Sequence, residues 1–336
     1  MMPTADTTDG SHRRVGAAWL VSVVGAPVAV AFLASVLAGA LAATTVPVLV
    51  GTTAGRAAMD VAGIACVGVG LVAALVPVAA SGRSHQADLA AAAVHRRVDR
   101  ILVLAAAAWL VAGVLSVVFR TADAFGRSPA TLSGAELVAW TTRLGAGRGM
   151  VLTVGCAAVV LGCAVARLRD PALVQLRIPL VAALLGVLTP AVTGHAGSAP
   201  DHEIAVLSIA VHAGGAALWV GGLIAMVALV APHRELLDRA LPLFSTLAGV
   251  CLADVAVSGA INALVRIDSW SALVTTGYGW LVLAKIVGIA GIGALGGLTR
   301  ARLRAGRIPV LQWAAAETLV MAVTIGLAAA LTQSGT

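Results

Sequence analysis

Long runs of apolar residues, separated by short polar connections, follow one another along most of the chain. A transmembrane helix needs about 20 apolar residues to cross a hydrocarbon core of about 30 Å. Runs of this length do not show the ten-residue alternation that is typical of a barrel strand. The pattern therefore predicts an all-α, polytopic membrane helix bundle with about nine spans, near residues 16–42, 59–80, 101–119, 149–168, 176–194, 204–231, 242–265, 279–298 and 311–332.

The composition agrees with this prediction and excludes several classes of protein. The chain has 336 residues, of which 60% are hydrophobic and 11% are charged, whereas soluble domains carry about 25% charged residues. A water-soluble enzyme, a disordered chain and a fibrous protein are therefore excluded. The cysteines lie in apolar runs, so they indicate small hydrophobic residues rather than a disulfide scaffold; they are Cys66, Cys156, Cys163 and Cys251.

Positive charge is arranged in short clusters between the apolar runs. The net charge is +7, but only one of the 22 basic residues is a lysine, Lys285. Arginine clusters beside spans indicate membrane topology rather than a nucleic-acid partner, because cytoplasmic connections are enriched in basic residues. Most arginines fall on one side if the N-terminus is cytoplasmic, which predicts a short cytoplasmic tail at 1–14 and an extracytoplasmic C-terminus.

Two connections do not fit this simple scheme. The segment 120–148 carries four arginines on the outer side, and we expect a short interfacial helix within it, near 135–142. The segment 81–100 is interpreted as a solvated basic connection that contains His85 and His95, with an amphipathic cytoplasmic helix as the alternative. His12 and His233 also lie near arginines and are expected to be solvated.

Energy for any transport has to come from outside this chain. A P-loop places a lysine after a glycine-rich turn, and Lys285 lies in an apolar run without that spacing. The sequence therefore favours a protein that is not an enzyme. Transport would use a gradient, a membrane potential or a partner.

Four ionisable residues lie within predicted spans, namely His212, Asp254, Lys285 and Glu317. Each such residue costs about 2.5–3.5 kcal/mol on insertion scales, so each is a candidate functional residue. Asp254 and Lys285 either form an ion pair between two helices or act as a charge relay or gate. Glu317 is either protonated or paired at the cytoplasmic end, or it belongs to the same relay.

A group of histidines carries the most specific chemistry. His195 and His202 lie in a Pro/Gly-rich acidic connection without lysine or arginine, and His212 follows in the next span. Three imidazoles could converge on copper, zinc, iron or nickel, and an acidic outer loop would attract cations. The alternative for His212 is a hydrogen-bonded core residue.

Small residues accompany His212 along the same predicted helix. At α-helical spacing they form one stripe, which would let a neighbouring helix approach closely; the stripe is His212, Gly215, Trp219, Gly222 and Met226. Met226 is either a thioether ligand for copper or a filler of the core.

Several short motifs resemble the copper-resistance D family (CopD, also called PcoD). They are GHA at 194–196, His212 followed by ALWVGGL at 217–223, YGWLVLAK at 278–285, and Glu317 in a final span. The resemblance covers about 185–330. It implies a copper-resistance D-like membrane domain at 181–336, preceded by an N-terminal helical membrane region at 15–180.

The resemblance implies copper handling at the bacterial cytoplasmic membrane, usually described as copper uptake. It carries His195 and His212 over as copper contacts, whereas Lys285 and Glu317 are motif residues without an assigned role. A ligand role for His202 rests on the local chemistry alone. Asp254 and Met226 would belong to a deeper relay or gate.

The leading hypothesis is a copper transporter that takes copper at an outer histidine site. One alternative is a b-type haem electron carrier, which needs histidines from two helices as axial ligands. Another is a copper-binding assembly factor or sensor that moves no metal. The expected partners are the copper ion, the lipid bilayer, and a periplasmic copper-binding protein or an oxidase assembly partner, without nucleic acid. The direction of transport, the copper oxidation state and the coupling remain open.

Overall fold

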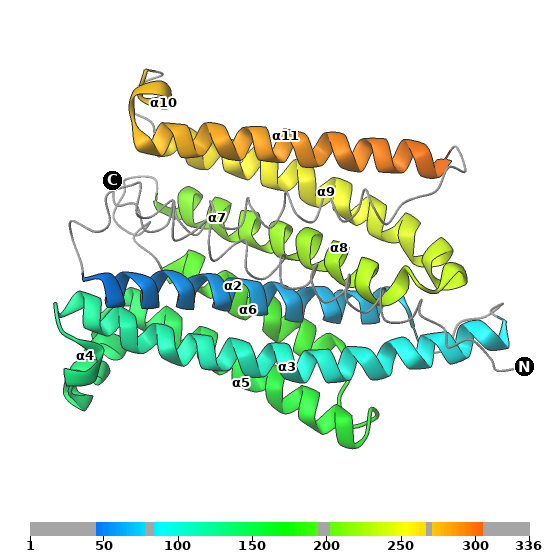
Figure 1. The fold of residues 1–336 in the computed structure, drawn as a ribbon, viewed down its shortest axis with the longest axis horizontal. Helices are drawn as coiled ribbons and strands as arrows, with labels where there is room; N and C mark the ends of the chain where they lie inside the picture. Colours follow the sequence, from blue (N-terminus) through cyan, green and yellow to red (C-terminus); the bar gives the residue numbers. More distant parts are fainter. Residues whose placement is uncertain (1–44, 78–83, 194–201, 267–270, 305–336) are drawn as a thin grey trace, which may run out of the picture.

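The computed structural model describes residues 45–77, 84–193, 202–266 and 271–304. These residues form helices joined by short connections, without any strand among them (Figure 1). In chain order the elements are α2 (Val46–Leu75), α3 (His85–Ala124), η2 (Pro129–Thr131), α4 (Gly134–Arg143), α5 (Gly145–Arg169), α6 (Arg177–Thr193), α7 (His202–Ala216), η4 (Ala217–Gly221), α8 (Gly222–Ala225), η5 (Met226–Val230), α9 (Arg234–Arg266), α10 (Ala272–Thr275) and α11 (Gly277–Arg304).

Five of the helical segments are long and apolar enough to cross a membrane, and they are Val46–Leu75, His85–Ala124, Gly145–Arg169, Val206–Val230 and Arg234–Ile261. Two shorter apolar helices, Arg177–Pro190 and Val282–Leu298, lie among them. The all-α prediction is confirmed, and every predicted run between 59 and 298 coincides with a helix. The first and last predicted runs lie outside the described residues, so the nine-span count and the cytoplasmic N-terminus stay predictions.

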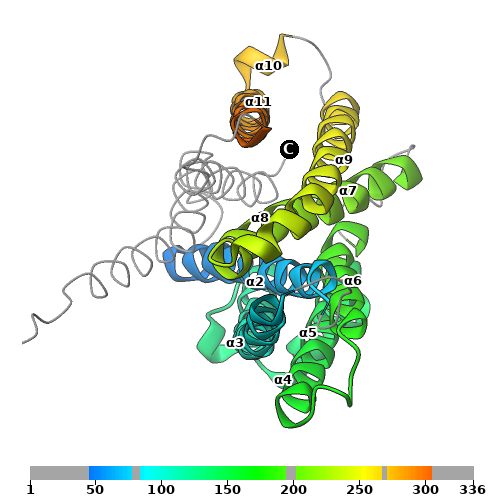
Figure 2. The same cartoon turned by 90° about the vertical axis from the view of Figure 1, so that its right-hand side faces the viewer.

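Helix α2 is the central element of the bundle. It packs against α3 and α6 on one side and against η4, α8 and η5 on the other. Helix α5 contacts both α3 and α6, and α9 packs along α7. Figure 2 shows these two groups on opposite sides of α2, with α11 beyond α9. The chain therefore forms two helical layers that meet at α2.

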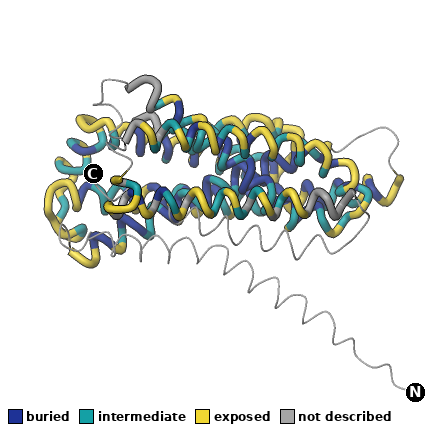
Figure 3. The backbone as a smooth tube through the Cα atoms, turned by 90° about the horizontal axis from the view of Figure 1, so that it is seen from above, coloured by how far each residue is buried: buried dark blue, intermediate teal, exposed yellow. Residues whose placement is uncertain are grey.

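Apolar side chains fill the inside of the bundle and also occur on its outside; Figure 3 shows how buried and exposed residues alternate along the helices. Met59, Leu102 and Trp109 are almost completely buried. Large apolar side chains nevertheless point outward along several helices, including Leu104, Val111, Val159, Leu185 and Val250. A soluble monomer rarely exposes contiguous apolar surface on this scale. This surface is what a bilayer covers, so the fold is that of a multi-pass membrane protein.

Glycines bring α2 and η4 into backbone contact. A Cβ atom added at Gly68 would overlap the backbone of Gly221, with the Gly221 Cα only 2.7 Å away. Small residues allow this kind of close approach between membrane helices. Trp219 and Met226 are buried in the core, and a ligand role for Met226 stays a prediction.

Two wider turns interrupt the predicted stripe, because η4 and η5 are π-helical and a π-helical turn shifts the face on which later residues lie. Within the stripe, Gly215 lies against Asp254 of α9, whereas Gly222 lies against both Phe244 of α9 and Leu71 of α2.

The short helix predicted near 135–142 is confirmed as α4, and its place at the membrane interface stays a prediction. Ser133 caps it, since its side chain accepts a hydrogen bond from the Glu136 backbone N–H while its own backbone N–H donates to the Glu136 carboxylate at 2.8 Å. These hydrogen bonds favour the charged form and hold the pKa of Glu136 below its ordinary value. Trp140 is buried against the bundle and Val138 is exposed, as in a helix that lies at a membrane surface.

Helix α3 begins much earlier than predicted. Ser84 caps it by accepting a hydrogen bond from Ala87 N–H at 3.1 Å. The Ser84 hydroxyl in turn donates a 2.6 Å hydrogen bond to the Glu235 carboxylate of α9. Residues 85–100 are therefore helical and not a solvated connection. His95 is 8% exposed, and its Nε2 donates to the Val76 carbonyl at 2.6 Å. The prediction of a solvated His95 was wrong, whereas His85 is exposed.

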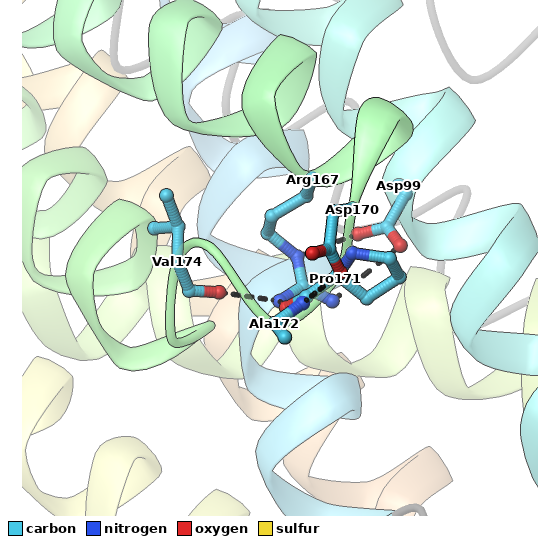
Figure 4. A network of polar contacts seen from close by, with 6 residues as sticks. All are labelled: Asp99, Arg167, Asp170, Pro171, Ala172 and Val174. Carbon is cyan, nitrogen blue, oxygen red and sulfur yellow. Dashed lines mark hydrogen bonds and ion pairs between the residues drawn. The ribbon is translucent and has the colours of Figure 1, made fainter.

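A buried ion pair joins α3 to α5 at the end of the bundle where α2 ends. Arg167 Nε lies 2.8 Å from Asp99 Oδ1, and both side chains are less than 10% exposed. Figure 4 shows that the same guanidinium also reaches the loop after α5, where the carbonyl oxygens of Pro171 and Val174 accept from Nη1. The carboxylate and both carbonyls satisfy the guanidinium, as a buried charge requires.

Candidate functional site

Polar side chains gather around Gly215 where α7 packs against α9, and we call this group the polar seam; it consists of Ser208, His212, Asp254 and Ser258. Positions 208, 212 and 215 follow i, i+4, i+7 on α7, so they lie on one face. Positions 254 and 258 are one turn apart on α9. Both helices are candidate membrane spans, so the polar seam lies within the apolar bundle and is a functional candidate by default.

Hydrogen bonds fix the orientation and the tautomer of His212. Nδ1 of His212 lies 2.9 Å from Oγ of Ser258, and Oγ lies 2.6 Å from the carbonyl oxygen of Asp254. A carbonyl only accepts, so the single hydroxyl proton of Ser258 is donated to Asp254. Oγ therefore accepts from Nδ1–H. In the neutral ring the lone pair is then on Nε2, which is the nitrogen that can bind a metal.

The carboxylate of Asp254 lies against α7, one turn from His212. A Cβ at Gly215 would collide with Asp254 Oδ2, and Cγ would be 3.3 Å away. Glycine at 215 therefore leaves the space that the carboxylate fills. Cys251 is buried one turn further along α9 and lies within range of the Asp254 charge. An imidazole, a carboxylate and a thiol thus follow one another along the contact between the two helices.

The other predicted site residues are described only in part. His195 and Glu317 lie outside the described residues, as do the side chains of His202 and Lys285. The backbone places His202 at the start of α7 and Lys285 within α11. Pairing between Asp254 and Lys285 therefore stays a prediction.

The helical backbone separates two of the predicted ligands. His202 and His212 are ten residues apart on α7, which is about 15 Å along the axis at 1.5 Å per residue. Metal–nitrogen bonds are about 2 Å long, so both imidazoles cannot bind one ion while this helix is intact. Within the described residues no three His, Cys, Asp or Glu side chains gather closely enough to hold a metal.

Sequence reasoning missed the serines of the polar seam. Ser258 orients His212, and Ser208 donates to the Ser258 carbonyl at 3.0 Å. Ser258 lies 46 residues from His212 in sequence. The sequence did offer one signal for Ser258, because it lies one helical turn from Asp254 within the same predicted span.

The comparisons with known proteins agree with the earlier resemblance. The family model described as "Copper resistance protein D-like, N-terminal domain" matches residues 48–202, and the one described as "Copper resistance protein D" matches residues 238–331. Together they cover most of the chain. The chain belongs to the copper resistance protein D family. Residues 203–237, including His212, lie between the two matched segments.

One curated relative carries copper transport in its name. The "Copper transport protein CutJ" of Bacillus subtilis (strain 168) is 31% identical over 104 residues. The match covers 30% of this chain and 19% of CutJ. No solved structure matches the chain.

Proposed function

We propose that this copper resistance protein D family member carries copper ions inward across the bacterial cytoplasmic membrane, with His212 Nε2 as the first ligand inside the bundle. The observation that carries the proposal is the Ser258–His212 hydrogen bond of 2.9 Å, which orients the imidazole within an apolar bundle. Neutral imidazole is a ligand that suits copper. The family and the name of the CutJ relative support copper as the substrate.

Entry occurs at the end of the bundle where α7 begins. His195 and His202 precede His212 along the chain, and the acidic residues around them attract cations. Because His202 and His212 are too far apart on α7 to bind one ion together, we assign the two imidazoles to successive positions of the ion along its route. The arginine clusters between α5 and α6 and at the start of α9 support a cytoplasmic position for the opposite end.

Beyond His212 the contact between α7 and α9 offers softer ligands. Asp254 supplies a carboxylate, and the Cys251 thiol follows one turn deeper in the core. Thiol and thioether sulfurs suit Cu(I), so Cys251 and then Met226 are the next positions for the ion. Lys285 and Glu317 act as a relay or gate beside this route. The protein is a carrier rather than an enzyme, and a periplasmic copper-binding protein or an oxidase assembly partner delivers or receives the ion.

The decisive experiment measures copper movement and copper binding with the same purified protein. Reconstituted in proteoliposomes, the wild type should accumulate copper well above protein-free vesicles, with bound copper present in the detergent-purified sample. Bound copper without accumulation would indicate an assembly factor or sensor. A Soret band without copper would indicate the haem carrier, and either result would overturn the proposal.

Ser258→Ala should weaken copper binding about tenfold, because loss of a hydrogen bond that orients a metal-bound imidazole typically costs 10–100-fold in affinity. The measurement is a competition titration of the purified protein with a chelator of known copper affinity. Ser258→Thr, which keeps the hydroxyl, should restore the wild-type value. Ser208→Ala is the matched control, because it removes a seam hydroxyl that donates to a backbone carbonyl, that of Ser258. Equal losses in Ser258→Ala and Ser208→Ala would show that Ser258 only stabilises the helix contact.

A further inference from the structure

The segment 120–148 carries a surplus of positive charge. It holds four arginines and two acidic residues, namely Arg120, Arg127, Arg143, Arg148, Asp123 and Glu136. The first two arginines have counter-charges: Arg120 lies within α3 in electrostatic range of Asp123, and Arg127 lies 3.3 Å from Glu136. The surplus charge therefore belongs to Arg143 and Arg148, which form no ion pair within the part of the chain that the structure describes.

Arg143 and Arg148 lie at a tight corner between α4 and α5. Arg143 is the last residue of α4, and Arg148 lies near the start of α5. A Cβ added at Gly147 would overlap the carbonyl oxygen of Trp140, so the two helices are in contact at this corner. Nη2 of Arg148 reaches back to the Arg143 carbonyl oxygen at 3.4 Å. Both arginines are exposed, so the corner presents two positive charges at the surface of the bundle.

An apolar face of α5 continues from this corner along the bundle. Positions 148, 152, 155 and 159 follow i, i+4, i+7, i+11, so they share one face of the helix. Leu152 and Val159 are 58% and 50% exposed. Gly155 lies between them, and a Cβ added there would meet no atom of the described residues within 4 Å. Helix α5 is a candidate membrane span, so this open apolar face, with an arginine at its head, is a surface for lipid.

The chemistry of the matching ligand follows from the two parts of this surface. Guanidinium groups bind phosphate oxygens through strong, charge-assisted hydrogen bonds, and basic residues beside a span attract anionic lipids. Free inorganic phosphate would satisfy the charges but would leave the apolar face uncovered. A zwitterionic phospholipid would cover the apolar face, but the cationic group of its head would be repelled by the arginines. An anionic phospholipid matches both parts together.

We infer that Arg143 and Arg148 bind the phosphate of one anionic phospholipid, such as phosphatidylglycerol, whose acyl chain lies along Leu152, Gly155 and Val159 of α5. The bound lipid neutralises the surplus positive charge and fixes the corner between α4 and α5 at the level of the lipid headgroups. This surface takes no part in the polar seam, so its test does not depend on copper or on the proposed function.

The test is a lipid titration of the purified full-length protein in detergent, with the number of bound lipids read by native mass spectrometry. Phosphatidylglycerol should bind about 25-fold more tightly than phosphatidylcholine with the same acyl chains, because each arginine beside an anionic lipid contributes about fivefold. Inorganic phosphate added at the same concentration as the lipid should displace none of it. Equal affinities for the two lipids, or displacement by phosphate, would overturn the inference.

Variants locate the lipid on the protein. Arg143→Gln and Arg148→Gln should each weaken phosphatidylglycerol binding about fivefold and leave phosphatidylcholine binding unchanged; both residues are exposed, so the variants should keep the fold. Arg127→Gln is the matched control, because it makes the same change in net charge at an arginine that is paired with Glu136. A double variant at 143 and 148 that keeps the wild-type lipid preference would contradict the site. An equal loss in Arg127→Gln would also contradict it, because net charge alone would then attract the lipid.

Discussion

Cells that express the His212→Ala variant should lose the copper accumulation that the wild type confers. Loss of a group that merely orients a metal ligand costs 10–100-fold in affinity, so loss of the ligand itself should cost at least about 100-fold. The variant also removes the hydrogen bond to Ser258, but it leaves the glycine contacts between α2 and η4 unchanged. The measurement is copper per cell by metal analysis, normalised to the amount of the protein in the membrane.

The control for this experiment is His85→Ala. His85 is exposed at the start of α3, far along the bundle from the polar seam, so its removal tests whether any imidazole affects cellular copper. Copper content in His85→Ala cells should equal the wild type. Unchanged copper in His212→Ala cells, with equal protein in the membrane, would remove His212 from the route and leave the family assignment standing.

The positions of the spans were predictable because the bilayer imposes a length. Any apolar run of about 20 residues has to become a helix that satisfies its own backbone hydrogen bonds. The ends of the helices were not predictable in the same way. Arg56 and Asp60 lie at the start of the apolar run predicted at 59–80. Helix α2 nevertheless begins earlier, at Val46, and continues through both residues, which pair with each other at i, i+4 spacing.

The sequence could predict individual residues of the candidate site from their ionisable side chains, but it could not predict how these residues are arranged. His212 and Asp254 stand out because ionisable residues are costly inside a span. Their arrangement depends on contacts between distant parts of the chain, such as the hydrogen bond between His212 and Ser258, 46 positions apart. The π-helical turns of η4 and η5 also redirect side chains, and no simple residue pattern predicts such turns. Sequence reasoning therefore identified the candidate ligand but not the group that orients it.

The pair between Asp99 and Arg167 shows the same limit and gives the largest expected effect on stability. The residues are 68 positions apart, and each looked like an ordinary charge near a connection. Asp99→Ala should lower the free energy of unfolding by about 3–5 kcal/mol, because it leaves a buried guanidinium without its counter-charge. The measurement is denaturant or thermal unfolding in detergent. Arg239→Ala is the control, since its 3.5 Å pair with Glu235 is exposed and should contribute at most about 1 kcal/mol.

A double variant separates the cost of an uncompensated charge from the value of the pair itself. Apolar replacement of both members of a buried ion pair is often neutral or stabilising, so Asp99→Leu combined with Arg167→Met should recover much of the stability that Asp99→Ala loses. Recovery should stop short of the wild type, because Arg167 also satisfies the carbonyl oxygens of Pro171 and Val174. A double variant as unstable as Asp99→Ala would mean that those loop contacts, rather than the charge pair, hold α5 to its neighbours. The role of Asp99 would then be to neutralise Arg167, whose hydrogen bonds to the loop carbonyls would supply the stability.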